Sequence, residues 1–298
     1  MPDEDDAFMG LSQEELSRQL NVEMTIDDLP GYQHEAAVLS DRARKTHPGN
    51  CNLAYGDDEV QVLDIFAPEN PDSLPVLMDI HGGGWRAGSK NVRSLAAPAI
   101  NDAGVLWVPI DYGLAPDYTI AQIVDHTRTA VAWVYRHISA YGGDPEKIYV
   151  SGNSAGGHLT GALLMPGWHR AHGLGEHVIK GACAMSGVFN LQVLVHAGPG
   201  YNDDLCMDLA TARDHSPLFH LPGRGCPLII AVGESEPDEF RRQSRTFCEA
   251  WTSRGFPATE IIVPEAHHFA MSRQLGLPDS AVFKAVTEMI LGAPAPKI

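Results

Sequence analysis

The chain has 298 residues, and its 21 Lys and Arg against 38 Asp and Glu give a formal net charge of −17 at pH 7. Because nucleic-acid binding needs clustered basic residues, this charge balance excludes an extended phosphate-binding surface. The hydrophobic fraction of 44% and the charged fraction of 20% are those of a globular protein and exclude a chain that is disordered throughout.

The elements predicted in chain order alternate between strands and helices. Short apolar runs rich in β-branched residues predict strands at Val60–Phe66, Val76–Ile80, Val105–Ile110, Lys147–Ser151, Gly181–Ser186, Leu228–Val232 and Glu260–Val263. Helical spacing of apolar residues predicts helices at Thr119–Ala140, directly after Ser154, at about Glu239–Arg254 and at about Ser280–Leu291. This alternation predicts an α/β fold whose mostly parallel central sheet carries helices on both faces.

The domain organisation is expected to be simple. We expect a single domain over residues 1–298, with an N-terminal extension over about residues 1–50. The stretch Pro166–Leu221 is rich in Gly, His and Asp, and we expect it to be irregular and to be a candidate lid over the site. The tail Gly292–Pro296 is expected to be frayed.

The cysteines and the N-terminus bear on location. Met1–Asp6 is acidic where a secretory signal would be positively charged, and no apolar run approaches the roughly 18–20 residues that span a bilayer. The five cysteines are widely spaced without a C-x-x-C pair, so we expect reduced thiols. We therefore expect a cytoplasmic protein with a small-molecule substrate and no nucleic-acid or membrane partner. A homodimer is compatible with the sequence, which does not determine the oligomeric state.

The segment Gly152-Asn153-Ser154-Ala155-Gly156 lies between a predicted strand and a predicted helix. It has the pattern G-x-S-x-G, in which a tight turn exposes a serine hydroxyl and the glycines avoid side-chain collisions. The helix that follows directs backbone N–H groups and its positive end at the same place. The pattern in this setting favours a catalytic role for Ser154 over an ordinary glycine-rich turn.

A second glycine-rich segment, His81-Gly82-Gly83-Gly84-Trp85, follows the strand that ends at Ile80. Glycines allow close approach of the backbone and present N–H donors to a developing oxyanion. We expect the N–H groups of Gly83, Gly84 and Ala155 to form an oxyanion hole. His81 is expected to anchor the loop, and Trp85 is a candidate for the wall of a substrate pocket.

Taken together, HGGGW, DYGLAP at Asp111–Pro116, GNSAGGH at Gly152–His158 and a late His-Phe pair resemble the α/β-hydrolase superfamily. The resemblance is to hormone-sensitive-lipase-like esterases and to arylformamidases (kynurenine formamidases), and it extends roughly from Tyr55 to His268. It implies an α/β-hydrolase fold and a serine hydrolase with a Ser-acid-His triad that needs neither cofactor nor metal.

The remaining triad members follow from this resemblance. The acid of the arylformamidases lies four residues before the Phe of an F-x-x-Q-S segment, which selects Glu236 here, where Asp is usual; Asp238 and Glu234 remain alternatives. Their histidine directly precedes a Phe, which selects His268 over His267. A metal site is not expected, because the spacing of the nearby residues matches no standard ligand pattern; these residues are His169, His172, Glu176 and His177.

The resemblance implies hydrolysis of an aryl formamide such as N-formylkynurenine through an acyl-enzyme. The alternative is a short-chain carboxylesterase, because three glycines in the loop are usual in esterases, whereas many formamidases carry a bulkier residue in place of Gly84. A non-enzyme alternative is an inactive hydrolase fold that serves as a receptor, since fold alone does not determine function.

Overall fold

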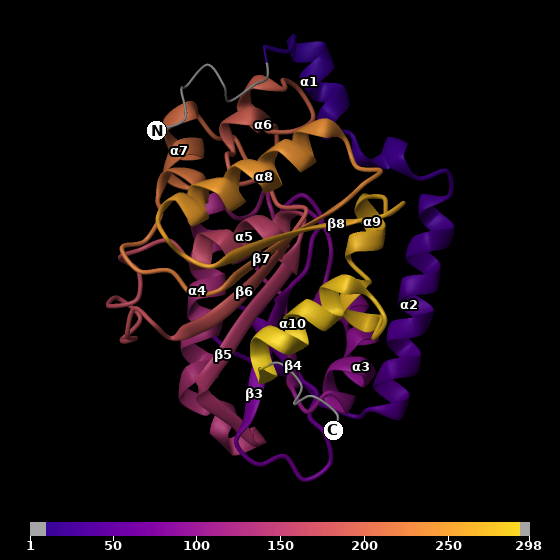
Figure 1. The fold of residues 1–298 in the computed structure, drawn as a ribbon, viewed down its shortest axis with the longest axis vertical. Coiled ribbons are helices and arrows are strands. Elements are labelled where there is room, and N and C mark those ends of the chain that lie inside the picture. Colours follow the sequence, from indigo (N-terminus) through magenta and orange to yellow (C-terminus); the bar gives the residue numbers. More distant parts are fainter. Residues whose placement is uncertain (1–9, 293–298) are drawn as a thin grey trace.

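The structure is a computed structural model that describes residues 10–292, and Figure 1 shows its arrangement. The acidic start at Met1–Asp6 and nearly all of the tail that we expected to be frayed lie outside the described residues. Within residues 10–292, no helix is long and apolar enough to cross a lipid bilayer.

The centre of the molecule is an eight-stranded sheet in the order β1-β2-β4-β3-β5-β6-β7-β8. All seven predicted strands are present, with ends shifted by up to four residues. The strands are β1 Asn50–Ala54, β2 Val62–Ile65, β3 Leu74–Ile80, β4 Leu106–Ile110, β5 Gly143–Asn153, β6 Ile179–Met185, β7 Leu228–Gly233 and β8 Ala258–Val263. From β4 to β8 across the sheet all neighbours are parallel, whereas β2 is antiparallel to both β1 and β4.

Two apolar layers cover the sheet, because successive side chains of a strand point to opposite faces. On one face, Val76, Met78 and Ile80 of β3 pack in the cluster that includes α4 (Ile120–His137), α5 (Ala155–Leu163) and α8 (Asp238–Ser253). On the other face, Leu77 packs in the cluster that includes α3 (Ala97–Asp102) and α10 (Ala281–Leu291). Figure 1 shows α10 crossing the near face of the sheet, with α4 and α5 behind it.

The predicted helices are present as α4, α5, α8 and α10, but one long helix, α2, and several short ones were not predicted from the sequence. The additional helices are α1 Gln13–Leu20, α2 Leu29–Thr46, α3, α6 Gln192–His196, α7 Leu209–Asp214 and α9 His268–Met271, with 3₁₀ turns at Val22–Thr25, Lys90–Ala96, Ile138–Tyr141, Pro217–Phe219 and Gln274–Gly276. The expectation that Pro166–Leu221 is irregular was wrong in part. Besides β6, which was predicted, the segment contains α6, α7 and a 3₁₀ turn, and most of its apolar side chains are buried.

The described part of the N-terminal extension, from residue 10 onward, packs on the body of the protein. Helix α1 contacts α6 and α8, and these helices lie together at the upper end of the molecule in Figure 1. Helix α2 packs along the 3₁₀ turn Lys90–Ala96. Tyr201, from the segment between α6 and α7, donates a hydrogen bond of 2.7 Å to the carbonyl oxygen of Ser17 in α1.

Candidate active site

Ser154 occupies a strained turn between β5 and α5. Its backbone has φ 56° and ψ −121°, in a region that non-glycine residues rarely adopt. A Cβ added to Gly152 would lie 2.4 Å from the carbonyl oxygen of Gly156, and one added to Gly156 would lie 2.0 Å from that of Ile80. Both glycines are therefore required by the tightness of the turn, which places Ser154 at the start of α5.

The glycine loop lies directly beside this serine. A Cβ on Gly82 would lie 3.1 Å from Cβ of Ser154, and one on Gly83, at φ +125°, would lie 2.0 Å from the carbonyl oxygen of Ala87. Gly84 has φ +60°, but the nearest neighbour of an added Cβ would be 3.7 Å away. The loop is thus tightly folded at Gly83, whereas a Cβ at Gly84 would make only ordinary van der Waals contact with the Arg86 side chain.

Hydrogen bonds from both sides hold the loop in place. Nδ1 of His81 lies 2.7 Å from the carbonyl oxygen of Gly82, and because a carbonyl can only accept, Nδ1 carries the proton. The hydroxyl of Tyr112 donates to the carbonyl oxygen of His81 at 2.9 Å, and the two rings stack with centroids 4.3 Å apart. Burial lowers the pKa of His81. Its position agrees with the anchoring role expected from the sequence.

Glu236 and His268 meet in a buried pair at the carboxyl ends of β7 and β8. Nδ1 of His268 lies 2.6 Å from Oε2 of Glu236, and both residues are 3% exposed. Oε1 of Glu236 accepts hydrogen bonds from the Ser186 hydroxyl at 2.5 Å and from the N–H of Gly233 at 2.8 Å. Since these two donors require an acceptor at Oε1, the arrangement suits a carboxylate that receives the Nδ1 proton of His268.

The end of β6 connects this pair to the serine turn. The N–H of Ser154 donates to the carbonyl oxygen of Met185 at 2.8 Å, and Ser186, the next residue, holds Glu236. Ser154, Glu236 and His268 thus lie at the carboxyl edge of the sheet. The open α/β sheets bind their ligands at this edge.

Comparison with known proteins shows which fold family the chain belongs to. The BD-FAE family matches residues 63–196. The kynurenine formamidase of Danio rerio is 29% identical over 300 residues, covering 95% of this chain and 98% of its own. A crystal structure from Silicibacter sp. TM1040, provisionally assigned as a thioesterase, superposes with a TM-score of 0.79 at 26% identity, covering 93% of this chain and 99% of its own. The chain is an α/β-hydrolase. A further relative of this hydrolase, the isoprenylcysteine alpha-carbonyl methylesterase of Arabidopsis thaliana, is 33% identical but covers 65% of this chain and 42% of its own.

The alternative acids of the hydrolase make other contacts. The carboxylate of Asp238, in the first turn of α8, is 58% exposed and forms an ion pair with Arg241. Oε2 of Glu234 accepts from the backbone N–H of Glu265 at 3.0 Å. Neither contact involves a histidine, whereas Glu236 bonds His268 directly.

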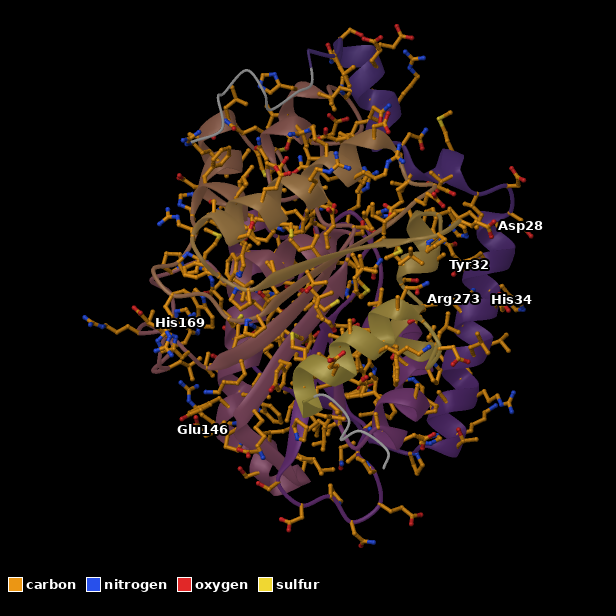
Figure 2. The ribbon with its side chains drawn as sticks, in the orientation of Figure 1. Asp28, Tyr32, His34, Glu146, His169 and Arg273 are labelled. Carbon is orange, nitrogen blue, oxygen red and sulfur yellow. The ribbon has the colours of Figure 1, made fainter. Side chains whose placement is uncertain are left out.

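His267 faces away from this pair, toward α2. Its ring meets that of Tyr32 edge to face with centroids 5.1 Å apart, and Arg273 lies 3.5 Å above the Tyr32 ring. Figure 2 shows Tyr32 and Arg273 next to one another beside α2. Burial lowers the pKa of His267. The structure therefore separates the two adjacent histidines by their surroundings.

Two polar residues that contact Glu236 and Trp85 were given no role from the sequence: Ser186 and His158. Ser186 directly follows the buried apolar strand β6, which pairs with β7, the strand that leads to Glu236. A polar residue at this position could have indicated a contact with the acid. His158 was quoted as part of the motif GNSAGGH but was given no role. It is fully buried, and its Nδ1 lies 3.1 Å from Nε1 of Trp85. Trp85 itself is 4% exposed, so the structure places this candidate pocket residue largely in the interior.

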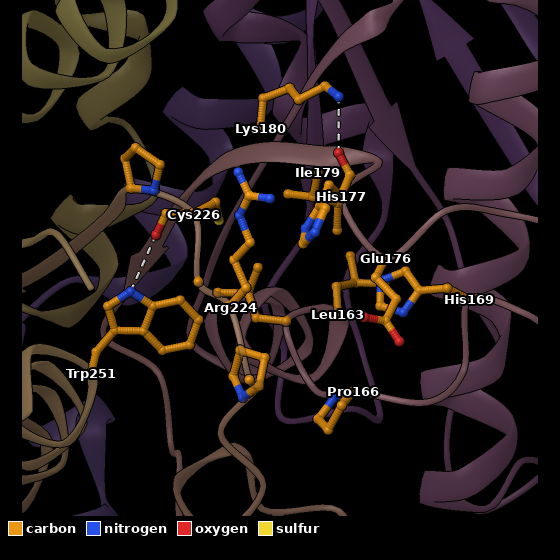
Figure 3. Close-up of a pocket in the computed structure, with 15 residues that line it drawn as sticks. Leu163, Pro166, His169, Glu176, His177, Ile179, Lys180, Arg224, Cys226 and Trp251 are labelled. Atoms are coloured by element: carbon orange, nitrogen blue, oxygen red, sulfur yellow. Dashed lines mark hydrogen bonds between the residues drawn. The ribbon is translucent and has the colours of Figure 1, made fainter. Parts of the chain in front are cut away.

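A cavity of about 240 Å³ lies at the amino ends of β6 and β7, away from the carboxyl edge that carries Ser154, and Figure 3 shows the residues that line it. Its lining includes the amino ends of β6 and β7, with Lys180, Arg224, His169 and Glu176 among the charged or titratable side chains. His177 also lines it, and its carbonyl oxygen accepts from Lys180 at 2.9 Å. Among residues 10–292, no group of His, Cys, Asp and Glu side chains is arranged to hold a metal ion.

Proposed function

We propose that this hydrolase cleaves its substrate through an acyl-enzyme, with Ser154 as nucleophile, His268 as base and Glu236 as orienting acid. The observation that carries the proposal is the buried 2.6 Å contact between His268 and Glu236, joined through β6 to the strained Ser154 turn. With Nδ1 committed to the carboxylate, the neutral ring of His268 presents an unprotonated Nε2. That nitrogen is the atom that accepts the serine proton.

The chemistry proceeds in two balanced halves. Ser154 Oγ attacks the carbonyl carbon while its proton passes to Nε2 of His268, and the carbonyl oxygen takes up the negative charge. The N–H groups of Gly83, Gly84 and Ala155 are proposed to stabilise this oxyanion. When the tetrahedral intermediate collapses, His268 returns the proton to the leaving amine or alcohol. Water then attacks the acyl-enzyme by the same route and releases the acid and free Ser154.

We propose an aryl formamide, with N-formylkynurenine as the type compound, as the substrate. The support is that the kynurenine formamidase of Danio rerio matches along 95% of this chain and 98% of its own length. The Arabidopsis methylesterase, in contrast, matches over 42% of its length. Hydrolysis of such a formamide yields formate and the free arylamine. The small formyl group leaves the remaining space of the site for the aromatic amine.

A short-chain carboxylesterase is the second candidate, and the glycine loop favours it. The nearest atom to an added Cβ on Gly84 would belong to the Arg86 side chain, 3.7 Å away, so the loop has room there for a methyl group that a formyl substrate does not need. A longer acyl chain could use this room, and an ester leaving group demands less assistance from His268 as an acid than an amine does.

One comparison of rates separates these candidates. The ratio of kcat/KM for N-formylkynurenine to kcat/KM for p-nitrophenyl acetate and butyrate is measured on wild type, with Ser154→Ala as the blank. Faster cleavage of the formamide supports the first candidate. Undetectable formamide cleavage beside rapid butyrate hydrolysis would assign the protein to the esterases, and no turnover of either would favour a receptor.

We also propose a cytoplasmic location. The support is that all five cysteines are unpaired in the structure, as expected in a reducing compartment. Fractionation of the native host with an antibody against the protein tests this location, and recovery from an extracytoplasmic fraction would contradict it.

A further inference from the structure

The oxyanion loop contains a bulky residue in a conformation that needs support. Trp85, which ends the loop, has φ +60°, in the left-handed region that an indole-bearing residue rarely adopts. Such a conformation persists only where surrounding contacts hold it. Two contacts do so here: the carbonyl oxygen of Trp85 accepts from the N–H of Ala115 at 2.9 Å, and its indole N–H meets His158 at 3.1 Å.

The chemistry of these partners determines the proton positions on His158. An indole nitrogen can only donate, so Nδ1 of His158 must be the acceptor of the Trp85 hydrogen bond. Nε2 lies 2.8 Å from the carbonyl oxygen of His215 and must therefore carry the proton that it donates. Burial lowers the pKa of His158 to about 4, which keeps the ring neutral and Nδ1 available as an acceptor near pH 7.

His158 lies one turn along the same helix that Ser154 begins. The backbone N–H of His158 donates to the carbonyl oxygen of Ser154 at 3.0 Å. Its side chain therefore connects three parts of the site: the nucleophile helix α5, the glycine loop through Trp85, and the segment after α7 through His215. The glycine loop follows β3 and Ser154 follows β5, so the position of the loop relative to the serine depends on contacts between the two segments, such as the bond from Trp85 to His158.

We propose that His158 is a positioning residue that holds Trp85, and through it the N–H groups of Gly83 and Gly84, against the start of α5. This inference rests on the proposed oxyanion hole. Oxyanion donors act mainly in the transition state, so a displaced loop lowers kcat while leaving KM nearly unchanged. A residue needed only for stability would lower the melting temperature without this division between kcat and KM.

Two substitutions separate the bonds of His158. In His158→Asn the amide oxygen reaches the position of Nδ1 and keeps an acceptor for Trp85, but the bond to His215 is lost. In His158→Gln the longer side chain reaches the position of Nε2 and keeps a donor to His215, but leaves the indole N–H of Trp85 without an acceptor.

The experiment measures kcat and KM for p-nitrophenyl acetate in these variants, with melting temperatures for each. We expect kcat to fall about 10- to 100-fold in His158→Gln, a fraction of the loss caused by removing an oxyanion donor outright. In His158→Asn we expect kcat within about threefold of wild type, with KM within about threefold in both variants. Trp85→Phe removes the same bond from the other side, and combining it with His158→Gln should cause little further loss, because the two changes break one interaction.

Asn101→Ala is the matched control for buried hydrogen bonding. Asn101 is buried in α3, on the opposite face of the sheet, and its amide donates to the carbonyl oxygens of Phe66 and Val105. This variant should lower the melting temperature without lowering kcat.

The inference fails if His158→Gln keeps wild-type kcat, or if His158→Asn loses at least as much, because the bond to Trp85 would then not matter. If His158→Gln does not fold, Trp85→Phe decides the same question alone. A wild-type protein that turns over no ester or formamide would contradict the proposed function instead. In that case the rate of Ser154 labelling by a fluorophosphonate replaces kcat, with the same order expected among the variants.

Discussion

The acid of the triad provides the sharpest single substitution, Glu236→Gln. The carboxylate accepts three hydrogen bonds in wild type, from the hydroxyl of Ser186 and the N–H of Gly233 at Oε1 and from Nδ1 of His268 at Oε2. In the variant, the amide oxygen can keep the two donors at Oε1. The amide NH₂ group then faces His268, and since it can only donate, the ring must move its proton from Nδ1 to Nε2.

The magnitude follows from what this exchange removes. A charge-assisted hydrogen bond contributes about 1.5–3 kcal/mol, and the wrong tautomer adds about 1–3 kcal/mol for a mismatched buried polar contact. Together these costs are about 2.5–6 kcal/mol, which corresponds to a loss of about 10²- to 10⁴-fold in kcat at 1.4 kcal/mol per factor of ten. Asp238→Asn is the matched control, because that carboxylate is exposed and pairs with Arg241; its loss should stay below about threefold.

The assay is kcat/KM for p-nitrophenyl acetate in wild type and both variants, with the melting temperature as a check on folding. A loss at Asp238→Asn equal to or larger than that at Glu236→Gln would refute the assignment of the acid. Equal small losses in folded variants would show that neither Glu236 nor Asp238 orients His268.

Three further predictions concern the base, the glycine loop and the support beneath it. His268→Ala should lose about 10⁴-fold in kcat and His267→Ala less than about fivefold, because the ring of His267 lies against Tyr32 of α2. The reverse order in the same assay would assign the base to His267. Gly83→Ala should lose more than about 100-fold in kcat through collision with the loop backbone, whereas Gly84→Ala, which has space but keeps φ +60°, should lose less than about tenfold; equal losses would contradict this contrast. Asp79, in β3 beneath the glycine loop, forms a buried ion pair with Arg93 at 2.6 Å. Asp79→Ala should lower the free energy of unfolding in urea by about 3–5 kcal/mol, because it leaves the buried guanidinium of Arg93 without its carboxylate. A change below about 1 kcal/mol would contradict the importance of this ion pair.

The sheet could be predicted from the sequence because its buried strands are continuous apolar runs. Leu106–Ile110 is buried at every position, and a short apolar run that closely follows a glycine, here Gly104, predicts a buried strand. Strand β1, Asn50–Ala54, was missed because it lies at the edge and its residues are mostly exposed and polar. Pairing with β2 holds it in place, and no local pattern encodes that contact.

The helices that were missed are short or depend on tertiary contacts. Helix α9 has four residues and begins at His268 itself, so no periodicity can reveal it. Helix α2 has 18 residues, but only Ser40 and Ala43 are buried, which leaves no apolar stripe to recognise.

The candidate site was predictable where a residue type and a turn are linked by local chemistry. The glycines around Ser154 follow from the geometry of the turn, as the close approach of Gly156 to the carbonyl oxygen of Ile80 shows. The acid was predictable only through resemblance, because three carboxylates lie within five residues and spacing alone does not separate them. The contact to Ser186 is made across 50 residues of chain and required the structure.

The central claim is that Ser154 is the nucleophile of this hydrolase. The most direct test incubates the native protein with a fluorophosphonate and locates the adduct by peptide mass spectrometry. The account predicts one adduct, on the peptide that contains Ser154, with loss of esterase activity in proportion to labelling and no adduct in Ser154→Ala. An active wild-type protein that is left unlabelled, or an inactivating adduct on another residue, would contradict it.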